Sequence, residues 1–218
     1  MTVAAVILAA QPSSSLADAS GTPAARRLTD VAWAGGATPV VVCSFDPDGA
    51  VAAALANTEA ALVAPAPVEQ GPAGQIANGL AAAVALVAET SAALVWPARM
   101  AWVDAETVTS LIAAHGEDRS ALLRPAYRGE AGWPALVPVT ALGALRAIAP
   151  DRMPDDVLAD LAARGVPITL VETGDPGTTH DIGTPQASLP EYDGPPEPAD
   201  APEWGAAVAE DLDQEDAR

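Results

Sequence analysis

Apolar positions along the chain gather into two kinds of segment that alternate with one another. The short runs Val3–Ala10, Pro39–Cys43, Ala60–Val63 and Ala92–Trp96 are almost wholly apolar, which is typical of strands buried on both faces of a parallel sheet. Because it is apolar throughout, Ala92–Trp96 is expected to lie near the centre of that sheet. Further strands are expected at Ala121–Arg124, Ala135–Val137 and Ile168–Glu172.

Longer alanine-rich stretches between these runs predict helices. In the first of them, Thr22 is expected to cap the N-terminus, Pro23 to occupy the first turn and Gly35 to follow the last turn. The other expected helices are Pro72–Glu89, Asp104–His115 (which ends at Gly116), 139–148 and 154–165. Alternating strands and helices predict an α/β fold in which helices pack on a mostly parallel sheet.

The composition changes after Pro185. Segment 186–218 is rich in proline, aspartate and glutamate and poor in large apolar side chains, so it buries too little surface to offset its chain entropy. We therefore predict one domain over residues 1–185 and a disordered acidic tail over 186–218. Within that tail, Trp204, Val208 and Leu212 are four residues apart and would share one helical face. This spacing fits either a docking helix for a protein partner or a solvated acidic helix.

The charge of the chain limits its partners. Its 218 residues carry a formal net charge of −19, which disfavours nucleic acid and anionic membranes as partners. All ten basic residues are arginines, so no lysine is present to bind a phosphate. No apolar stretch approaches the ~20 residues that cross a bilayer, and no basic segment precedes the first strand, so we expect a soluble cytoplasmic protein.

The single cysteine and the two histidines offer little chemistry. Cys43 lies in an apolar run, where a buried core residue is expected rather than a reactive thiol. His115 and His180 do not have the spacing of metal ligands, so a zinc site is not expected.

From Val3 to Pro185, the order of motifs resembles the small nucleotidyltransferases that include molybdenum cofactor cytidylyl- and guanylyltransferases. In that family the first strand ends in L-A-A-G, and a loop with serine, arginine, glycine and lysine follows. The corresponding nucleotide-binding positions here are Leu8, Ala9, Ala10, Gln11, Ser13 and Ser14. The resemblance implies a Rossmann-like three-layer α/β/α sandwich and a nucleoside triphosphate as ligand. However, glutamine replaces the glycine that lets the backbone approach phosphate, and the loop has no cation to neutralise it.

The second family motif is G-D-x-P-x-V, whose aspartate binds a metal ion. Aligning Val103 with its valine places Ala98 and Arg99 at the glycine and aspartate positions, so a guanidinium replaces a carboxylate that would bind Mg²⁺. Asp104 is the nearest carboxylate. It is expected to cap the following helix, and a shifted metal site is the alternative.

The closing family motif, D-x-D-T-P, corresponds to residues 181–185. Gly183 replaces the second aspartate, so Asp181 is the surviving candidate metal ligand. We predict that Arg99 and Asp181 form an ion pair where a metal ion would otherwise bridge two carboxylates.

A third motif, Y-x-G-x-x-G-H-P, lines the acceptor side of the cleft in the family. Tyr127, Gly129 and Gly132 match it, and Trp133 replaces the histidine. Trp133 is expected to hold the loop by packing, with stacking on a ligand as the alternative. Arg128 is expected to be exposed, either solvated or facing an anionic acceptor.

These patterns leave three functions open. We favour a nucleotidyltransferase-fold protein whose catalysis is weakened or lost. The alternative is an active enzyme that uses Mg²⁺ and transfers a nucleotidyl group to a phosphorylated acceptor such as a molybdopterin. A third possibility is an interaction protein that binds its partner through the acidic tail.

Overall fold

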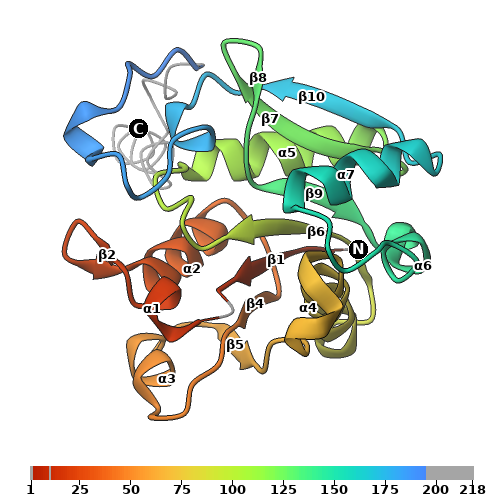
Figure 1. The fold of residues 1–218 in the computed structure, drawn as a ribbon. Coiled ribbons are helices and arrows are strands. Elements are labelled where there is room, and N and C mark those ends of the chain that lie inside the picture. The colour runs from red at the N-terminus through yellow and green to blue at the C-terminus, as the bar shows by residue number, and fades with distance from the viewer. Residues whose placement is uncertain (1, 10, 195–218) are drawn as a thin grey trace, which may run out of the picture.

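The computed structural model of the chain describes residues 2–9 and 11–194. Its centre is a sheet with the strand order β10-β7-β9-β6-β1-β4-β5, in which β8 pairs with β7 (Figure 1). The strands of this sheet are β1 (Thr2–Leu8), β4 (Val40–Cys43), β5 (Ala60–Val63), β6 (Thr90–Pro97), β7 (Leu122–Tyr127), β8 (Glu130–Ala131), β9 (Ala135–Pro138) and β10 (Ile168–Glu172). Two short strands, β2 (Asp18–Ala19) and β3 (Thr22–Pro23), form a separate hairpin.

Most neighbouring strands are parallel, as the apolar runs predicted. β1 is parallel to β4 and β6, β4 to β5, and β10 to β7, whereas β9 is antiparallel to both of its neighbours. β6 lies in the middle of the strand order, which confirms the central position expected for Ala92–Trp96. Ile7 is in register with both Val42 and Trp96, so the carboxyl ends of β1, β4 and β6 meet at one edge of the sheet.

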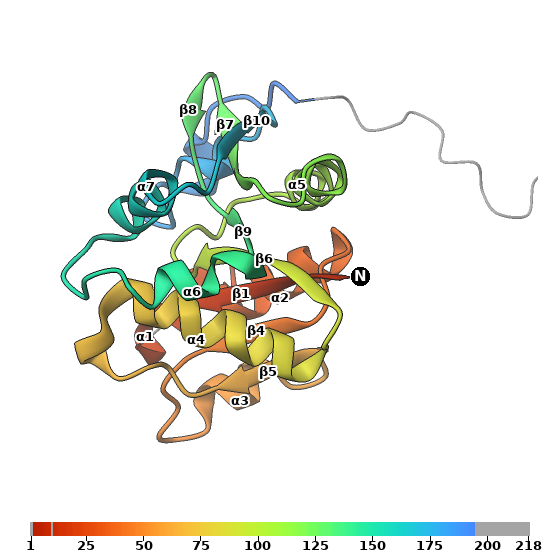
Figure 2. The same cartoon turned by 90° about the vertical axis from the view of Figure 1, so that its right-hand side faces the viewer.

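Helices cover both faces of the sheet. They are α1 (Pro12–Ser15), α2 (Ala24–Ala34), α3 (Ala50–Ala54), α4 (Gly71–Leu86), α5 (Ala105–Glu117), α6 (Leu142–Leu145) and α7 (Pro154–Ala163). α2 packs against α5 on one face, and α4 packs against α6 and α7 on the other (Figure 2). The expected three-layer α/β architecture is confirmed.

Several local predictions differ from the structure. Thr22 does not cap α2, because it pairs with Ala19 in the β2–β3 hairpin and Pro23 takes the N-cap position. The loop expected after β1 contains a helical turn, α1, whose first residue is a proline. The helix expected over 139–148 is a 3₁₀ turn (Val139–Ala141) followed by the short α6.

Aliphatic side chains fill the space between sheet and helices, and Cys43 is buried among them, as predicted. α4 comes close to β1 at Gly79, where an added Cβ would lie 2.2 Å from a methyl carbon of Val6. A glycine is therefore needed at this crossing. None of the described helices has the length and apolarity needed to cross a membrane.

The described residues beyond Pro185 contact the domain. Residues Gln186–Ser188 form a 3₁₀ turn, and the Ser20 hydroxyl donates to the side-chain oxygen of Gln186. The Tyr127 hydroxyl donates to the backbone oxygen of Glu191 at 2.9 Å. Residues 186–194 therefore pack on the domain rather than belonging to a disordered tail. The predicted stripe of Trp204, Val208 and Leu212 lies outside the described residues.

Candidate functional site

The end of β1 forms one wall of a cavity of about 470 Å³. Leu8 and Ala9 line this cavity, with Trp133 as another part of its wall. The amide of Ala9 donates to the Cys43 oxygen at 3.0 Å, which fixes the end of β1 beside β4. Ala10 lies outside the described residues. The position agrees with the general rule that ligands of α/β proteins bind at the carboxyl ends of parallel strands.

The serines predicted to bind phosphate do not line this cavity. Ser13 and Ser14 are exposed on α1, and Gln11 precedes that helix as an exposed N-cap residue without a side-chain capping bond. Ser15 is buried, and its hydroxyl donates to Ser44 at 2.7 Å. Ser13 and Ser14 thus lie on the exposed surface of α1, and Ser15 makes a hydrogen bond inside the protein.

The start of α4 supplies a second wall that the motif comparison missed. Gly71, Pro72, Gln75 and Ile76 line the cavity beside Leu8. A sequence signal for this position does exist, because Gly-Pro opens a helix directly after an extended segment. Periodicity alone, however, does not tell which helix face points at a ligand.

The ion pair predicted between Arg99 and Asp181 is confirmed. Arg99 follows β6, and its guanidinium Nη2 donates to Asp181 Oδ2. The other carboxylate oxygen, Oδ1, accepts from the amide of Gly183 at 2.8 Å. Both oxygens of Asp181 therefore have a partner within the chain.

Backbone contacts hold the two segments of this ion pair together. The amide of Ile182 donates to the Arg99 oxygen at 2.8 Å, and the indole nitrogen of Trp102 donates to the oxygens of Asp181 and Thr184. The guanidinium of Arg27 lies over the Trp102 ring, 5.6 Å from its centroid. The segments that correspond to the G-D-x-P-x-V and D-x-D-T-P motifs are thus neighbours in space.

Asp104 occupies the N-cap position of α5, but its side chain makes no capping hydrogen bond. Asp175, which no sequence motif indicated, is 1% exposed and holds the start of α5 through other bonds. Asp175 Oδ2 accepts from the Asp104 amide at 2.9 Å and from the Thr107 hydroxyl at 2.8 Å, and Oδ1 accepts from the Gly177 amide. Desolvation, together with the neighbouring Asp175 carboxylate, raises the pKa of Asp104 to about 6.

Asp181, the surviving candidate metal ligand, is already paired with a cationic side chain. Magnesium is usually held by one or two carboxylates plus substrate phosphates. Asp181 is engaged by Arg99, and Asp104 lies beside the hydrogen-bonded carboxylate of Asp175 instead. Across residues 2–9 and 11–194, no three histidine, cysteine, aspartate or glutamate residues are grouped so that they could hold a metal.

The acceptor-side loop is present, but Arg128 does not face a cavity. Arg128 and Gly129 form the turn between β7 and β8, both with positive φ. The Arg128 guanidinium donates to Asp193 at 2.7 Å and lies 4.8 Å from the centroid of the Tyr127 ring. Arg128 is thus exposed, as expected, but it pairs with the C-terminal segment rather than with solvent alone. Tyr127 itself holds Glu191.

Trp133 is 8% exposed and belongs to the hydrophobic core, which agrees with the packing role expected for it, and it also lines the cavity beside Leu8. Its amide donates to the Thr178 oxygen at 2.8 Å. At Gly132, an added Cβ would lie 2.3 Å from the same oxygen. The close approach of residue 178 therefore explains why glycine precedes the tryptophan.

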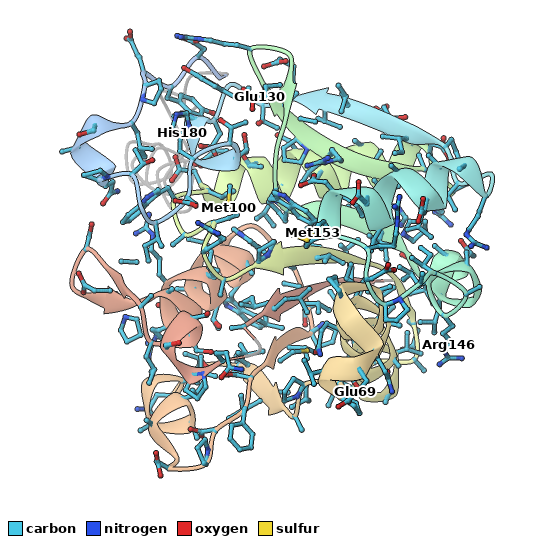
Figure 3. The ribbon with its side chains drawn as sticks, in the orientation of Figure 1. Glu69, Met100, Glu130, Arg146, Met153 and His180 are labelled. Atoms are coloured by element: carbon cyan, nitrogen blue, oxygen red, sulfur yellow. The ribbon has the colours of Figure 1, made fainter. Side chains whose placement is uncertain are left out.

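A second cavity, of about 430 Å³, lies on another side of Trp133 and has a polar lining. Gly132, Asp181, Arg124 and His180 contribute to it. The Arg124 guanidinium lies 5.2 Å from the centroid of Trp133 and also pairs with Asp155 at 2.9 Å. In Figure 3, Met100 lies by the chain that leaves β6, Met153 lies at the start of α7, and Glu130 and His180 lie above them in the view.

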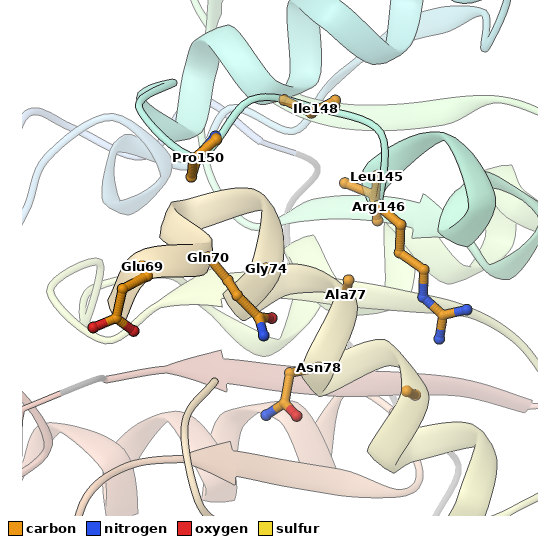
Figure 4. A pocket seen from close by; sticks show the side chains of 10 residues that line it. Glu69, Gln70, Gly74, Ala77, Asn78, Leu145, Arg146, Ile148 and Pro150 are labelled. Atoms are coloured by element: carbon orange, nitrogen blue, oxygen red, sulfur yellow. The ribbon is translucent and has the colours of Figure 1, made fainter. Parts of the chain in front are cut away.

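A third cavity, of about 390 Å³, lies between α4 and α6 (Figure 4). Arg146 reaches from the end of α6 along α4, and Gln70 and Asn78 border the same space. None of the residues singled out from the sequence motifs lines it.

Comparison with known proteins identifies the family. The model of the MobA-like NTP transferase domain matches residues 5–166, well over half of the chain. No curated protein matches the chain.

Solved structures share the fold at low identity. A nucleotidyl transferase from Methanothermobacter thermautotrophicus is 19% identical, with a TM-score of 0.63 over 78% of this chain and 87% of that one. A Mycobacterium tuberculosis H37Rv protein in complex with manganese is 17% identical, with a TM-score of 0.60 over 79% and 89%. The 2-C-methyl-D-erythritol 4-phosphate cytidylyltransferase from Thermus thermophilus is also 17% identical, with a TM-score of 0.61 over 85% and 95%. These similarities support the fold, and the family match shows that the chain belongs to the MobA-like NTP transferase domain family.

Proposed function

We propose that this chain is a ligand-binding member of the NTP transferase family whose metal-dependent nucleotidyl transfer is weakened or lost. The observation that carries the proposal is the ion pair between Arg99 and Asp181. It occupies the position where the family resemblance places a metal-binding aspartate.

The electrostatic argument is direct. A divalent cation about 4 Å from a guanidinium is repelled by about 2 kcal/mol even in bulk water, and by more near a protein surface. Asp181 offers little compensation, because the same guanidinium and the Gly183 amide already engage its oxygens. A metal ion would have to break this pair before it could bind.

The segment after β1 adds a second argument. In the family resemblance, a cationic loop neutralises the charge that develops as pyrophosphate leaves. Here residues 11–16 contain neither arginine nor lysine and include the helix α1. Leu8 and Ala9 line the cavity, but the residues that come next in the sequence include no cationic side chain that could neutralise this charge.

The second candidate function is active transfer from a nucleoside triphosphate to a phosphorylated acceptor, of which a molybdopterin is the example that the resemblance suggests. The polar cavity favours it, because Arg124 and His180 border a space beside the Gly132–Trp133 turn. An interaction function of the acidic tail is a third candidate, and its residues lie outside those described.

Thermal unfolding with CTP, GTP or ATP, each with and without Mg²⁺ or Mn²⁺, tests the proposal. A ligand at a hundred times its Kd adds about 2.7 kcal/mol, which corresponds to roughly 5–10 °C for a domain of this size. We expect no metal-dependent shift for the unmodified chain. Arg99→Asp restores a carboxylate next to Asp181, and we expect it to create or strengthen metal-dependent nucleotide binding.

Arg164→Asp is the matched control, because it makes the same charge change at an exposed arginine after α7. It should leave nucleotide binding unchanged. A metal-dependent shift in the unmodified chain, accompanied by pyrophosphate release with a phosphorylated acceptor, would overturn the proposal in favour of the active enzyme.

A further inference from the structure

The cavity of about 470 Å³ at the end of β1 is lined almost entirely by apolar groups. Leu8, Ile76 and Val95 contribute aliphatic side chains, and Trp133 contributes an aromatic wall. Its volume falls in the range of about 300–1,000 Å³ that is typical of small-molecule sites. It is thus large enough for a multi-ring or branched organic molecule.

Cys43 and Gln75 bring polar groups to the lining, and both side chains are neutral. Burial raises the pKa of the Cys43 thiol to about 12, so this group stays protonated at neutral pH. Gln75 donates its amide nitrogen to the Ala66 oxygen at 2.7 Å and accepts from the Ala66 amide at 2.9 Å. The lining drawn from the described residues includes no charged side chain.

The mouth of the cavity presents apolar side chains to water. Val68, in the turn before α4, is 82% exposed and lines the cavity. Pro150 borders the cavity from the segment between α6 and α7, and Pro154 borders it as the first residue of α7. An apolar ligand that covered these side chains would remove them from water, which favours binding.

A triphosphate does not match these surroundings. Arg124 and Arg99 lie outside the cavity lining, where Arg124 pairs with Asp155 and Arg99 pairs with Asp181. The net charge of −19 further disfavours a polyanionic ligand. A neutral ligand needs no cation in the lining and is not repelled by the negative charge of the chain.

We propose that this cavity binds an uncharged, largely apolar small molecule with an aromatic or branched aliphatic skeleton. This inference deepens the proposed function, because it names the class of ligand that the cleft would bind. It rests on that function, because it requires that no metal-bound triphosphate occupies the cleft.

A pair of fluorescent probes with similar ring systems tests the proposal. N-phenyl-1-naphthylamine is neutral, and 1-anilinonaphthalene-8-sulfonate carries a sulfonate; both emit more strongly in apolar surroundings. With the full chain, we expect saturable one-site binding of the neutral probe and binding weaker by about tenfold or more for the anionic one, because the lining supplies no cation.

Val68→Asp tests the location. It places a carboxylate at the mouth without disturbing the core, since Val68 is exposed, and it should weaken binding of the neutral probe by about tenfold. Leu86→Asp is the matched control: Leu86 is 52% exposed at the last residue of α4 and does not line the cavity. Unchanged binding to Leu86→Asp supports the proposal, and an equal loss in both variants overturns it.

Competition separates this inference from the proposed function. CTP with Mg²⁺ that displaces the neutral probe, and that releases pyrophosphate when a phosphorylated acceptor is added, would overturn both. If CTP with Mg²⁺ reacts in this way without displacing the probe, the proposed function falls and the apolar site stands. Absence of saturable probe binding, without nucleotide binding, overturns the apolar site alone.

Discussion

The guanidinium of Arg99 and the carboxylate of Asp181 form an ion pair between residues 82 positions apart in the sequence. The Arg99 side chain is 68% exposed and that of Asp181 is 28% exposed. Exposed pairs of this kind contribute about 0.2–1 kcal/mol to stability. The pair therefore contributes little to the stability of the fold.

Arg99→Ala should lower the free energy of unfolding by less than about 1 kcal/mol, because it removes only this exposed pair. Asp181→Ala should cost about 1–2 kcal/mol, since it also removes the acceptor for the Gly183 amide. Urea denaturation of the two single variants and the double variant measures the coupling between them. A coupling above about 2 kcal/mol would contradict the view of a weak surface pair.

Asp175 should be far more important for stability than either member of that pair. Asp175→Ala leaves the Asp104 and Gly177 amides and the Thr107 hydroxyl without their acceptor in a buried setting, at an expected cost of about 2–4 kcal/mol. Thr107→Val removes one of these bonds and should cost about 1 kcal/mol. Equal losses in the two variants, measured by urea denaturation, would show that the network is not centred on Asp175.

The apolar runs predicted the strands well. β4 and most of β1 and β6 are buried, and strands buried on both faces leave a strong signal. Ala60–Val63 and Ile168–Glu172 also coincide with β5 and β10, although β5 is half-buried and β10 is mostly exposed. The segment after β1 was harder: Pro12–Ser15 was expected to be loop because the family motif places a loop there, yet it forms α1.

The candidate site was predictable only where a motif fixed the spacing. The pairing of Arg99 with Asp181 was anticipated, because each aligns with a carboxylate position of one family motif. Asp175 was missed, since a buried acceptor for three donors depends on tertiary contacts that leave no local pattern. The wall of the apolar cavity formed by Gly71 and Ile76 was missed for the same reason.

Three glycine-to-alanine variants should change the free energy of unfolding by amounts that differ in sign and size. Gly132→Ala places a Cβ 2.3 Å from the Thr178 backbone oxygen, so the loop must shift, and we expect a loss of more than about 2 kcal/mol. Gly129→Ala meets no atom within 4 Å but requires a φ of +80°, which should cost about 1 kcal/mol. Gly116→Ala lies within α5 with open space around it and should gain about 0.5–1 kcal/mol.

Urea denaturation of the three variants ranks them. If Gly132→Ala were no worse than Gly129→Ala, the close approach of residue 178 would not be what requires glycine at this position.

Asp104 should make stability fall as pH rises. Its pKa is raised to about 6 in the folded protein, compared with about 3.9 in the unfolded chain, so the folded state binds the proton more tightly. This contribution is complete below about pH 4 and is lost as pH rises to about 6. Asp104→Asn should therefore gain stability relative to the unmodified chain across this window. Since Asp104 is exposed, the gain should stay below about 1 kcal/mol, and a difference that is constant with pH would contradict the assignment.

His115 should make the stability of the protein fall as pH falls, the opposite of the effect of Asp104. It is 1% exposed on α5, its Nε2 contacts the Ser91 hydroxyl at 3.1 Å, and its Nδ1 is buried without a partner among the described residues. Burial lowers the pKa of His115, and the neighbouring Arg119 lowers it further against the smaller opposing effect of Asp118. The folded state thus favours the neutral imidazole, and its contribution is complete above about pH 6.5 and is lost as pH falls.

His115→Leu should reduce the loss of stability at low pH, because leucine cannot be protonated. Ser91→Ala keeps the imidazole and should therefore keep this loss of stability. Melting temperatures of the three proteins between pH 5 and 8 provide the comparison. If His115→Leu lost as much stability on acidification as Ser91→Ala, the buried imidazole would not be the source, because only a group that titrates between the folded and unfolded states produces a pH slope.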